Sequence, residues 1–298
     1  MHYSNLKHTL PFLLFFAFLQ LAGAQNRFQN FDFNTTDVYR IVLFDGNEFV
    51  GNYLDHNDVS VSIKTNSIPK IDIPFDKIKA IDIVPQSNMK DGSYWFKNPH
   101  PTRYLFTPSA FNLEKGEGYY QNTYIIFNSV AYGVTDFLSL GAGVELISLF
   151  AGNGGPIFFV NVKGGGEIAK NFRLGANVLY VNVPTVFDDE QERYGAFIGG
   201  GLATYGSLDH NVTAGVGYAL AEGEFSSNPV FNLSGMTRIG KRTALVSENW
   251  IFAESALFSY GIRFFGEKIS VDLAFLNNGD IAEELVIGIP YVDFVVKF

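Results

Sequence analysis

The chain has 298 residues, of which 17% are charged and 16% aromatic, with 30 Gly, no Cys and a formal net charge of −9. The lack of cysteine excludes disulfide scaffolds, zinc ribbons, iron–sulfur sites and thiol nucleophiles, and the acidic balance argues against a nucleic-acid groove. Abundant Phe, Tyr, Val, Ile and Leu argue against disorder. No apolar run after the N-terminus reaches the roughly 18 residues of a spanning helix, so the composition indicates strands.

Residues 1–24 have the pattern of a secretory signal peptide. Lys7 precedes the apolar run Thr9–Leu21, and Ala22-Gly23-Ala24 fits the small-x-small cleavage pattern. The alternative, a membrane-anchoring helix, fits less well because the run is short and contains Pro11 and Gln20. We therefore predict an exported protein that begins at Gln25.

Residues 25–37 are predicted to be a polar leader, and 38–84 to be four or five short strands with a hairpin at Asp45-Gly46. The pattern Val42-x-Phe44-Asp45-Gly46-x-x-Phe49-x-Gly51 resembles the small Sm-like or SH3-like barrels, and the resemblance implies no nucleic-acid-binding residues here. We expect a small soluble periplasmic domain. Residues 85–102 are predicted to be a linker, in which Tyr94-Trp95-Phe96 either anchors at a membrane interface or packs against the small domain.

Residues 103–298 repeat one pattern, in which large apolar residues alternate with small or polar ones, as in Ile269–Phe275. Side chains alternate across a strand, so each segment has an apolar face and a small or polar face. Strands with one apolar face and one small or polar face suit a barrel with lipid outside and a polar lumen. The predicted strands are 103–111, 119–132, 137–147, 157–168, 171–182, 192–205, 209–221, 229–239, 243–252, 256–265, 268–276 and 285–298.

Short and long connections alternate between these segments. Short links such as Ala169-Lys170 and Gly266-Glu267 alternate with longer ones such as Ser148–Pro156 and Asn277–Glu284. Outer-membrane barrels have short periplasmic turns and longer external loops. This sorting places both ends of the barrel region in the periplasm.

The last predicted strand has one apolar face and ends on an aromatic residue. The residues concerned are Val292, Phe294, Val296 and Phe298. They resemble the C-terminal signature of outer-membrane barrels, which the assembly machinery reads. Across 103–298 the chain resembles a group of uncharacterised Gram-negative outer-membrane barrel proteins, which implies location and architecture but no activity.

Ionisable residues on the small and polar face are predicted to point into the lumen, because a charge facing lipid at the midplane costs about 2–4 kcal/mol. They are Glu145, Lys163, Glu167, Arg173, Arg263, Asp272, Asp293 and Lys297. Either they form ion pairs across a narrow barrel, or they line a pore that selects solutes, or a few of them form a catalytic cluster. The direction in which Arg238 and Glu248 point is ambiguous, because Val246 and Trp250, which are apolar, share the parity of Glu248.

Other features give weaker indications of chemistry. His210 is the only histidine in the predicted barrel and lies beside a short periplasmic turn, so we expect no enzyme. The acidic residues 188–192 could hold a hard cation or form a solvated loop that faces lipopolysaccharide. Gly164-Gly165-Gly166 and Gly199-Gly200-Gly201 are not phosphate loops, because no Lys-Ser/Thr follows either run.

The sequence therefore predicts an all-β protein, a transmembrane antiparallel barrel of about twelve strands preceded by a small periplasmic β-domain. The predicted function is passive passage or binding of small solutes in the outer membrane. The alternatives are a structural or interaction barrel with a filled lumen, whose periplasmic domain recruits a protein partner, then an outer-membrane enzyme, then a soluble β-protein. The expected partners are lipid, lipopolysaccharide and the assembly machinery. No cofactor, metal or nucleic acid is expected.

Overall fold

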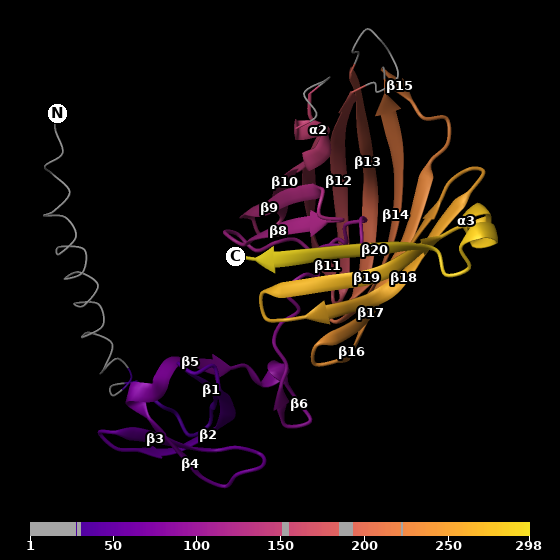
Figure 1. Ribbon diagram of the computed structural model, residues 1–298. Helices are drawn as coiled ribbons and strands as arrows, with labels where there is room; N and C mark the ends of the chain where they lie inside the picture. Colours follow the sequence, from indigo (N-terminus) through magenta and orange to yellow (C-terminus); the bar gives the residue numbers. More distant parts are fainter. Residues whose placement is uncertain (1–27, 29–30, 151–154, 185–192, 222) are drawn as a thin grey trace, which may run out of the picture. The chain divides into compact units, whose positions relative to one another are not determined.

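The computed structural model describes residue 28 and the ranges 31–150, 155–184, 193–221 and 223–298 (Figure 1). The predicted signal peptide and the acidic residues 188–192 lie outside the described residues. The chain divides into two compact units, Met1–Phe96 and Lys97–Phe298, here called the N-terminal unit and the barrel unit. In the described part of the chain, no helix is long and apolar enough to cross a membrane.

The N-terminal unit is built on one antiparallel sheet with the strand order β4-β3-β2-β1-β5. The hairpin predicted at Asp45-Gly46 is confirmed: β1 and β2 pair around it, and Gly46 has a φ of +89°. The elements are β1 (Val38–Leu43), β2 (Glu48–His56), β3 (Ser60–Lys64), β4 (Ile71–Pro74), η1 (Phe75–Lys77) and β5 (Ile78–Val84). The resemblance of this unit to the Sm-like or SH3-like barrels stays a prediction.

The core of this unit extends beyond the strands. Phe31 and Phe33, which the sequence assigns to a polar leader, pack against its buried cluster. The cluster consists of Tyr39, Ile41, Val61, Ile63, Ile73, Phe75 and Ile78. Burial of large aromatic rings is a strong source of stability in so small a core, so part of the predicted leader belongs to the folded unit.

The predicted linker also carries structure. After η2 (Gln86–Asn88), the two-residue strands β6 (Met89–Lys90) and β7 (Ser93–Tyr94) form a short hairpin. The Arg40 guanidinium lies 5.5 Å from the Tyr94 ring centroid and the Lys90 ammonium 4.4 Å from that of Trp95. These contacts favour packing within the N-terminal unit over a membrane-anchoring role for Tyr94-Trp95-Phe96.

The barrel unit is a closed ring of twelve antiparallel strands. Consecutive neighbours pair, β20 pairs with β8, and β13 pairs with β14, which closes the ring. The strands are β8 (Gly118–Thr123), β9 (Phe127–Thr135), β10 (Leu138–Glu145), β11 (Phe158–Ala169), β12 (Phe172–Pro184), β13 (Arg193–Gly206), β14 (His210–Ala221), β16 (Val230–Gly240), β17 (Thr243–Ile251), β18 (Ala256–Phe265), β19 (Ile269–Asn277) and β20 (Ile289–Lys297). A two-residue strand, β15 (Glu224–Phe225), adds to β14 outside the ring. The predicted twelve-stranded barrel is confirmed.

Two of the predicted strands are wrong, although the total is right. Residues 103–111 form no wall strand, only an isolated bridge between Arg103 and Pro108. The predicted strand 119–132 is two strands, β8 and β9, which a tight turn separates at Tyr124 and Ile125, both with positive φ. Pro108 gives the physical reason for the first error, since a proline cannot donate a ladder hydrogen bond in a central strand.

The wall alternates as expected. On β18, Phe258, Tyr260, Ile262 and Phe264 are exposed on the outer surface, whereas Ser259, Arg263 and Phe265 are buried.

The two ends of the barrel differ in their connections. We call the end with the short β9–β10, β11–β12, β13–β14, β16–β17 and β18–β19 turns the inner end. The outer end carries longer connections, including those with α2 (Leu146–Phe150) and α3 (Gly279–Glu284). Gly118 and Phe298 both lie at the inner end and pair through reciprocal backbone hydrogen bonds.

Candidate functional site

Residues 97–117, here called the lumen segment, run through the inside of the barrel before the chain joins its wall. Their side chains are mostly buried, and inward-facing side chains of β11, β13, β14 and β16 to β18 hydrogen-bond to them. The buried members are Asn98, His100, Thr102, Tyr104, Leu105, Thr107, Ser109, Ala110, Phe111 and Leu113. The segment has no ladder of its own, so its backbone groups need partners in the lumen.

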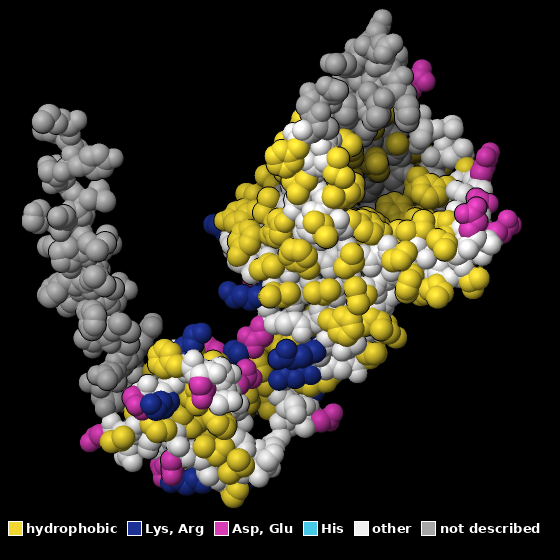
Figure 2. All heavy atoms as spheres, in the orientation of Figure 1, with side chains coloured by type: hydrophobic (Ala, Val, Ile, Leu, Met, Phe, Trp, Pro, Cys, Tyr) yellow, Lys and Arg dark blue, Asp and Glu magenta, His cyan; other side chains and the backbone are white. Residues whose placement is uncertain are grey.

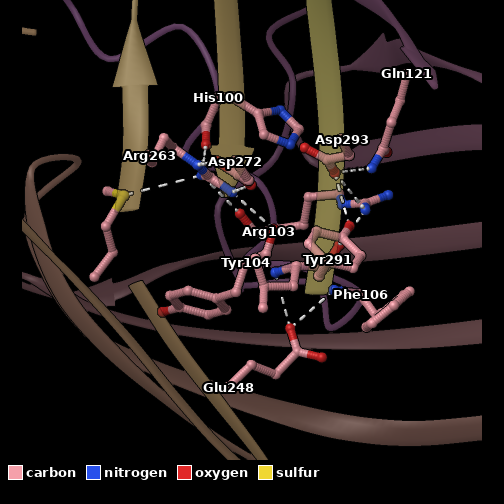
Figure 3. Close-up of polar contacts among 12 residues, drawn as sticks. His100, Arg103, Tyr104, Phe106, Gln121, Glu248, Arg263, Asp272, Tyr291 and Asp293 are labelled. Atoms are coloured by element: carbon pink, nitrogen blue, oxygen red, sulfur yellow. Dashed lines mark hydrogen bonds and ion pairs between the residues drawn. The ribbon is translucent and has the colours of Figure 1, made fainter. Parts of the chain in front are cut away.

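Arg263 supplies the first set of partners. Its guanidinium is fully buried, and Nη1 and Nη2 donate to the carbonyl oxygens of His100 and Tyr104, both at 2.8 Å, and to that of Arg103 at 3.2 Å (Figure 3). Asp272, directly opposite on β19, holds the guanidinium through Nε and Nη2 at 2.7 and 2.6 Å. This bidentate pair compensates the buried charge and fixes its direction.

Glu248 supplies a complementary partner for backbone donors. Its Oε2 accepts the N–H groups of Leu105, Phe106 and Thr107, each at 2.9 Å, while its Oε1 accepts Trp250 Nε1–H at 2.7 Å. Three successive amides that converge on one carboxylate form an anion-binding nest. Glu248 is completely buried, so these four donors replace its water shell.

Lys163 is the third clamp. Its ammonium, also buried, donates to the carbonyl oxygens of Thr102, Ser109 and Phe111 at 2.9, 3.2 and 2.5 Å. An ammonium has three donors, and all three are used on the lumen segment. Lys163, Glu248 and Arg263 therefore each bind three backbone groups of that segment.

Neutral side chains add further contacts between the wall and the segment. The Tyr104 hydroxyl donates to Asn211 Oδ1 at 2.6 Å and lies 2.7 Å from Thr213 Oγ1. The Ala110 N–H donates to Thr204 Oγ1 at 2.8 Å, and Asn232 Nδ2 donates to Thr107 Oγ1 at 2.9 Å.

A second carboxylate cluster lies beside the Arg263–Asp272 pair. Asp293 Oδ2 accepts from Gln121 Nε2 at 2.6 Å and from the Tyr291 hydroxyl at 2.8 Å, and Arg103 lies 3.6 Å away. The same Tyr291 hydroxyl, whose single proton serves one acceptor at a time, also lies 3.0 Å from the Leu105 carbonyl oxygen. Figure 3 shows these groups gathered around the segment. Three cations (Arg103, Lys163, Arg263) and three anions (Glu248, Asp272, Asp293) balance in this buried network.

The structure separates the eight predicted lumen residues into three groups. Lys163, Arg263, Asp272 and Asp293 belong to the buried network just described. Glu167 and Arg173 pair with each other and Lys297 pairs with Glu117, all near the inner end. Glu145 lies at the outer end, where it accepts the backbone N–H groups of Ile147 and Ser148.

Sequence reasoning missed the main partner of these groups, the lumen segment itself. Pro108 within 103–111 was the available signal against a wall strand. The sequence does not decide the direction of Glu248, because Trp250 shares its parity, yet in the structure Trp250 Nε1–H donates to Glu248 and both point inward. Arg238, also ambiguous, is buried and lies 3.0 Å from Asp209 at the inner end.

The described side chains do not assemble an evident reaction centre. His210 is exposed, and its Nδ1 lies 2.8 Å from Thr237 Oγ1 beside the short β13–β14 turn at the inner end. In the ranges that the structure covers, no group of three or more acidic or histidine residues could hold a metal ion. What this arrangement can do is hold a segment of chain inside a barrel.

Comparisons with known proteins add little. No protein-family model and no curated protein matches the chain. OmpF of Salmonella typhi, solved in complex with daunomycin, is 12% identical, covering 88% of this chain and 96% of that chain with a TM-score of 0.30. OmpT of Vibrio cholerae, an outer membrane protein solved with loop L8 deleted, is 11% identical with the same coverage and a TM-score of 0.31. The closed barrel of this chain rests on its own strand pairing.

Proposed function

We propose that this chain is an outer-membrane barrel whose lumen is closed by its own residues 97–117, so that it works as a binding or structural barrel and not as an open diffusion channel. The observation that carries the proposal is the triple clamp: Lys163, Glu248 and Arg263 each hold three backbone groups of the lumen segment. Removing one partner from a buried, charged hydrogen-bond network is costly, and this cost opposes spontaneous release.

The outer surface of the barrel supports membrane insertion. Large apolar side chains are exposed on the outward face of strand after strand, as with Leu140, Val162, Val178, Leu233 and Leu273. Figure 2 shows hydrophobic side chains spread over the visible barrel wall. So much apolar surface is rare on a protein that faces water and is the normal outer surface of a membrane barrel.

Planar-bilayer recording tests the closed lumen. The wild-type protein, refolded in detergent, is expected to insert without steady conductance. The double variant Lys163→Met/Glu248→Gln removes two of the three clamps and is expected to conduct. Glu254→Gln, an exposed outer-end change, is the matched control and is expected to stay silent. Heat-dependent mobility on SDS gels verifies that each variant has formed its barrel. Steady wild-type conductance would refute the proposal and restore the passive-passage interpretation.

A further inference from the structure

The half of the lumen beyond the lumen segment has a different chemistry. Side chains that alternate inward there, at the outer end, are largely apolar and still exposed: Phe127 is 39% exposed, Ile198 41%, Ile289 42% and Phe106, from the lumen segment, 44%. Figure 2 shows the molecule hollowed at the end that carries α3, with hydrophobic side chains inside the hollow. We call this hollow the outer bowl.

The register fixes which side chains line the bowl. Phe127 lies directly opposite Glu145 and Thr123, which share the inward face, and Ile289 lies opposite Leu276, two positions from the inward Ala274. Phe106 packs edge-on against Tyr291 at 4.9 Å, and Tyr291 in turn contacts Tyr124 of the outer β8–β9 turn at 5.5 Å. Phe106 therefore lies at the floor of the bowl.

Aromatic faces are prominent in this lining. Trp250 and Phe252, two residues apart on the β17 side, lie with nearly parallel rings, 8° between planes and 6.5 Å between centroids. The Trp250 Nε1–H is already bound by Glu248, so the face of its ring is what it offers to a ligand. Aromatic faces attract organic cations, because the ring face carries partial negative charge.

The described connections around the bowl carry charge of one sign, although Arg193 begins β13 at the same end. In the connections at the outer end that the structure describes, the acidic residues are Glu224, Glu254, Asp280, Glu283 and Glu284, and there is no Lys or Arg. The turns at the inner end, by contrast, carry both signs: they contain Lys170, Lys241, Arg242 and Lys268, and also Asp136, Asp209 and Glu267. Glu145 is the one carboxylate among the described inward-facing wall residues of the bowl, and it caps backbone N–H groups.

We infer that the outer bowl binds a small apolar cation, an organic molecule that carries positive charge on a largely hydrophobic or aromatic body. An apolar wall that is open to water gains free energy when an apolar body covers it. The acidic rim attracts a cation and repels an anion of the same shape, and the aromatic rings favour the cation again. This inference rests on the closed lumen proposed above, since the lumen segment forms the floor.

A pair of probes matched in shape and opposite in charge tests this. Tetraphenylphosphonium and tetraphenylborate are titrated against the full chain in a nonionic detergent, in a Trp95→Phe background so that Trp250 alone reports. We expect saturable Trp250 quenching by the phosphonium, with an affinity at least tenfold higher than for the borate. Ile198→Lys is expected to weaken phosphonium binding tenfold or more, whereas Ile83→Lys, on an exposed site of the N-terminal unit, leaves it unchanged.

The rim is tested separately with Asp280→Asn/Glu283→Gln/Glu284→Gln, which is expected to weaken phosphonium binding about threefold at low salt and less at high salt. The inference would be overturned by equal binding of both probes or by tighter binding of the borate. It would also be overturned if Ile198→Lys left the quenching intact, because the phosphonium would then only partition into the detergent. A conducting wild-type barrel would refute the closed lumen and with it the floor of the bowl, whereas an absent titration with a silent bilayer would refute the bowl alone.

Discussion

Glu248 accepts the backbone N–H of Phe106 at 2.9 Å, although 142 residues separate the two in the chain. The same oxygen accepts the N–H groups on either side of Phe106. A single carboxylate on the barrel wall thus fixes the turn of a segment that belongs to no strand. The contact explains why a charge is tolerated at full burial, and it turns the lumen network into a set of testable predictions.

Glu248→Gln is expected to loosen the lumen segment. The amide keeps one acceptor oxygen but loses the charge that strengthens three converging hydrogen bonds, so we expect a loss of about 1.5–3 kcal/mol in unfolding free energy. Urea unfolding in detergent, followed by circular dichroism, measures it. Glu254→Gln, on an exposed outer connection, is the control; if both variants lose the same small amount, the nest has no energetic role.

Asp272→Asn is expected to lower the free energy of unfolding by more than Glu248→Gln does. It leaves the Arg263 guanidinium fully buried with a neutral partner, and breaking a buried pair costs about 3–5 kcal/mol. The comparison is Glu167→Gln, whose partner Arg173 lies at the inner end where the pair is partly exposed, for which about 0–1 kcal/mol is expected. The midpoints of thermal or urea unfolding distinguish the two; equal costs would contradict the buried network.

The position of the lumen segment can be tested by a disulfide, because the chain has no native cysteine. A Cβ built on Gly175 of the wall lies 3.4 Å from Ala110 Cβ, near the roughly 3.5–4.5 Å of natural disulfides. Ala110→Cys/Gly175→Cys is therefore expected to cross-link on mild oxidation, seen as a reductant-sensitive shift on a denaturing gel.

The control for this cross-link addresses crowding at Gly175. Its new Cβ would lie 2.9 Å from the Gly164 carbonyl oxygen, so the backbone must shift slightly. Ala110→Ser/Gly175→Ser adds the same Cβ at Gly175, with a hydroxyl in place of each thiol, and cannot form the bond. If the serine pair folds and the cysteine pair still fails to oxidise, the segment does not lie where the structure places it.

Phe298→Ser separates an assembly signal from a stability role. Phe298 pairs with Gly118 through its backbone, which the substitution keeps, so refolding in detergent is expected to match wild type. If the terminal aromatic is read by the assembly machinery, the amount of folded barrel in the outer membrane falls several-fold. Phe264→Ser, equally outward-facing on β18, is the control; similar losses for both would assign the effect to lipid contact.

The sequence by itself determined the class of the fold. Period-two alternation along segments such as Ile269–Phe275 and the alternation of short and long connections follow from local geometry, since successive side chains of a strand point to opposite faces. These signals need no knowledge of distant residues. They also placed Lys163, Arg263, Asp272 and Asp293 on the inward face of their strands.

Only the tertiary structure decided what those inward charges do. Residues 103–111 look like one more strand in isolation, and Pro108 was a single local objection. Whether their backbone pairs with a neighbouring strand or with Lys163, Glu248 and Arg263 depends on side chains 52 to 160 residues away, which no local pattern encodes. The closed ring brings these partners together, and each of their buried charges takes three backbone groups of the lumen segment as partners, which is why the barrel contains a clamped segment where the sequence suggested a pore.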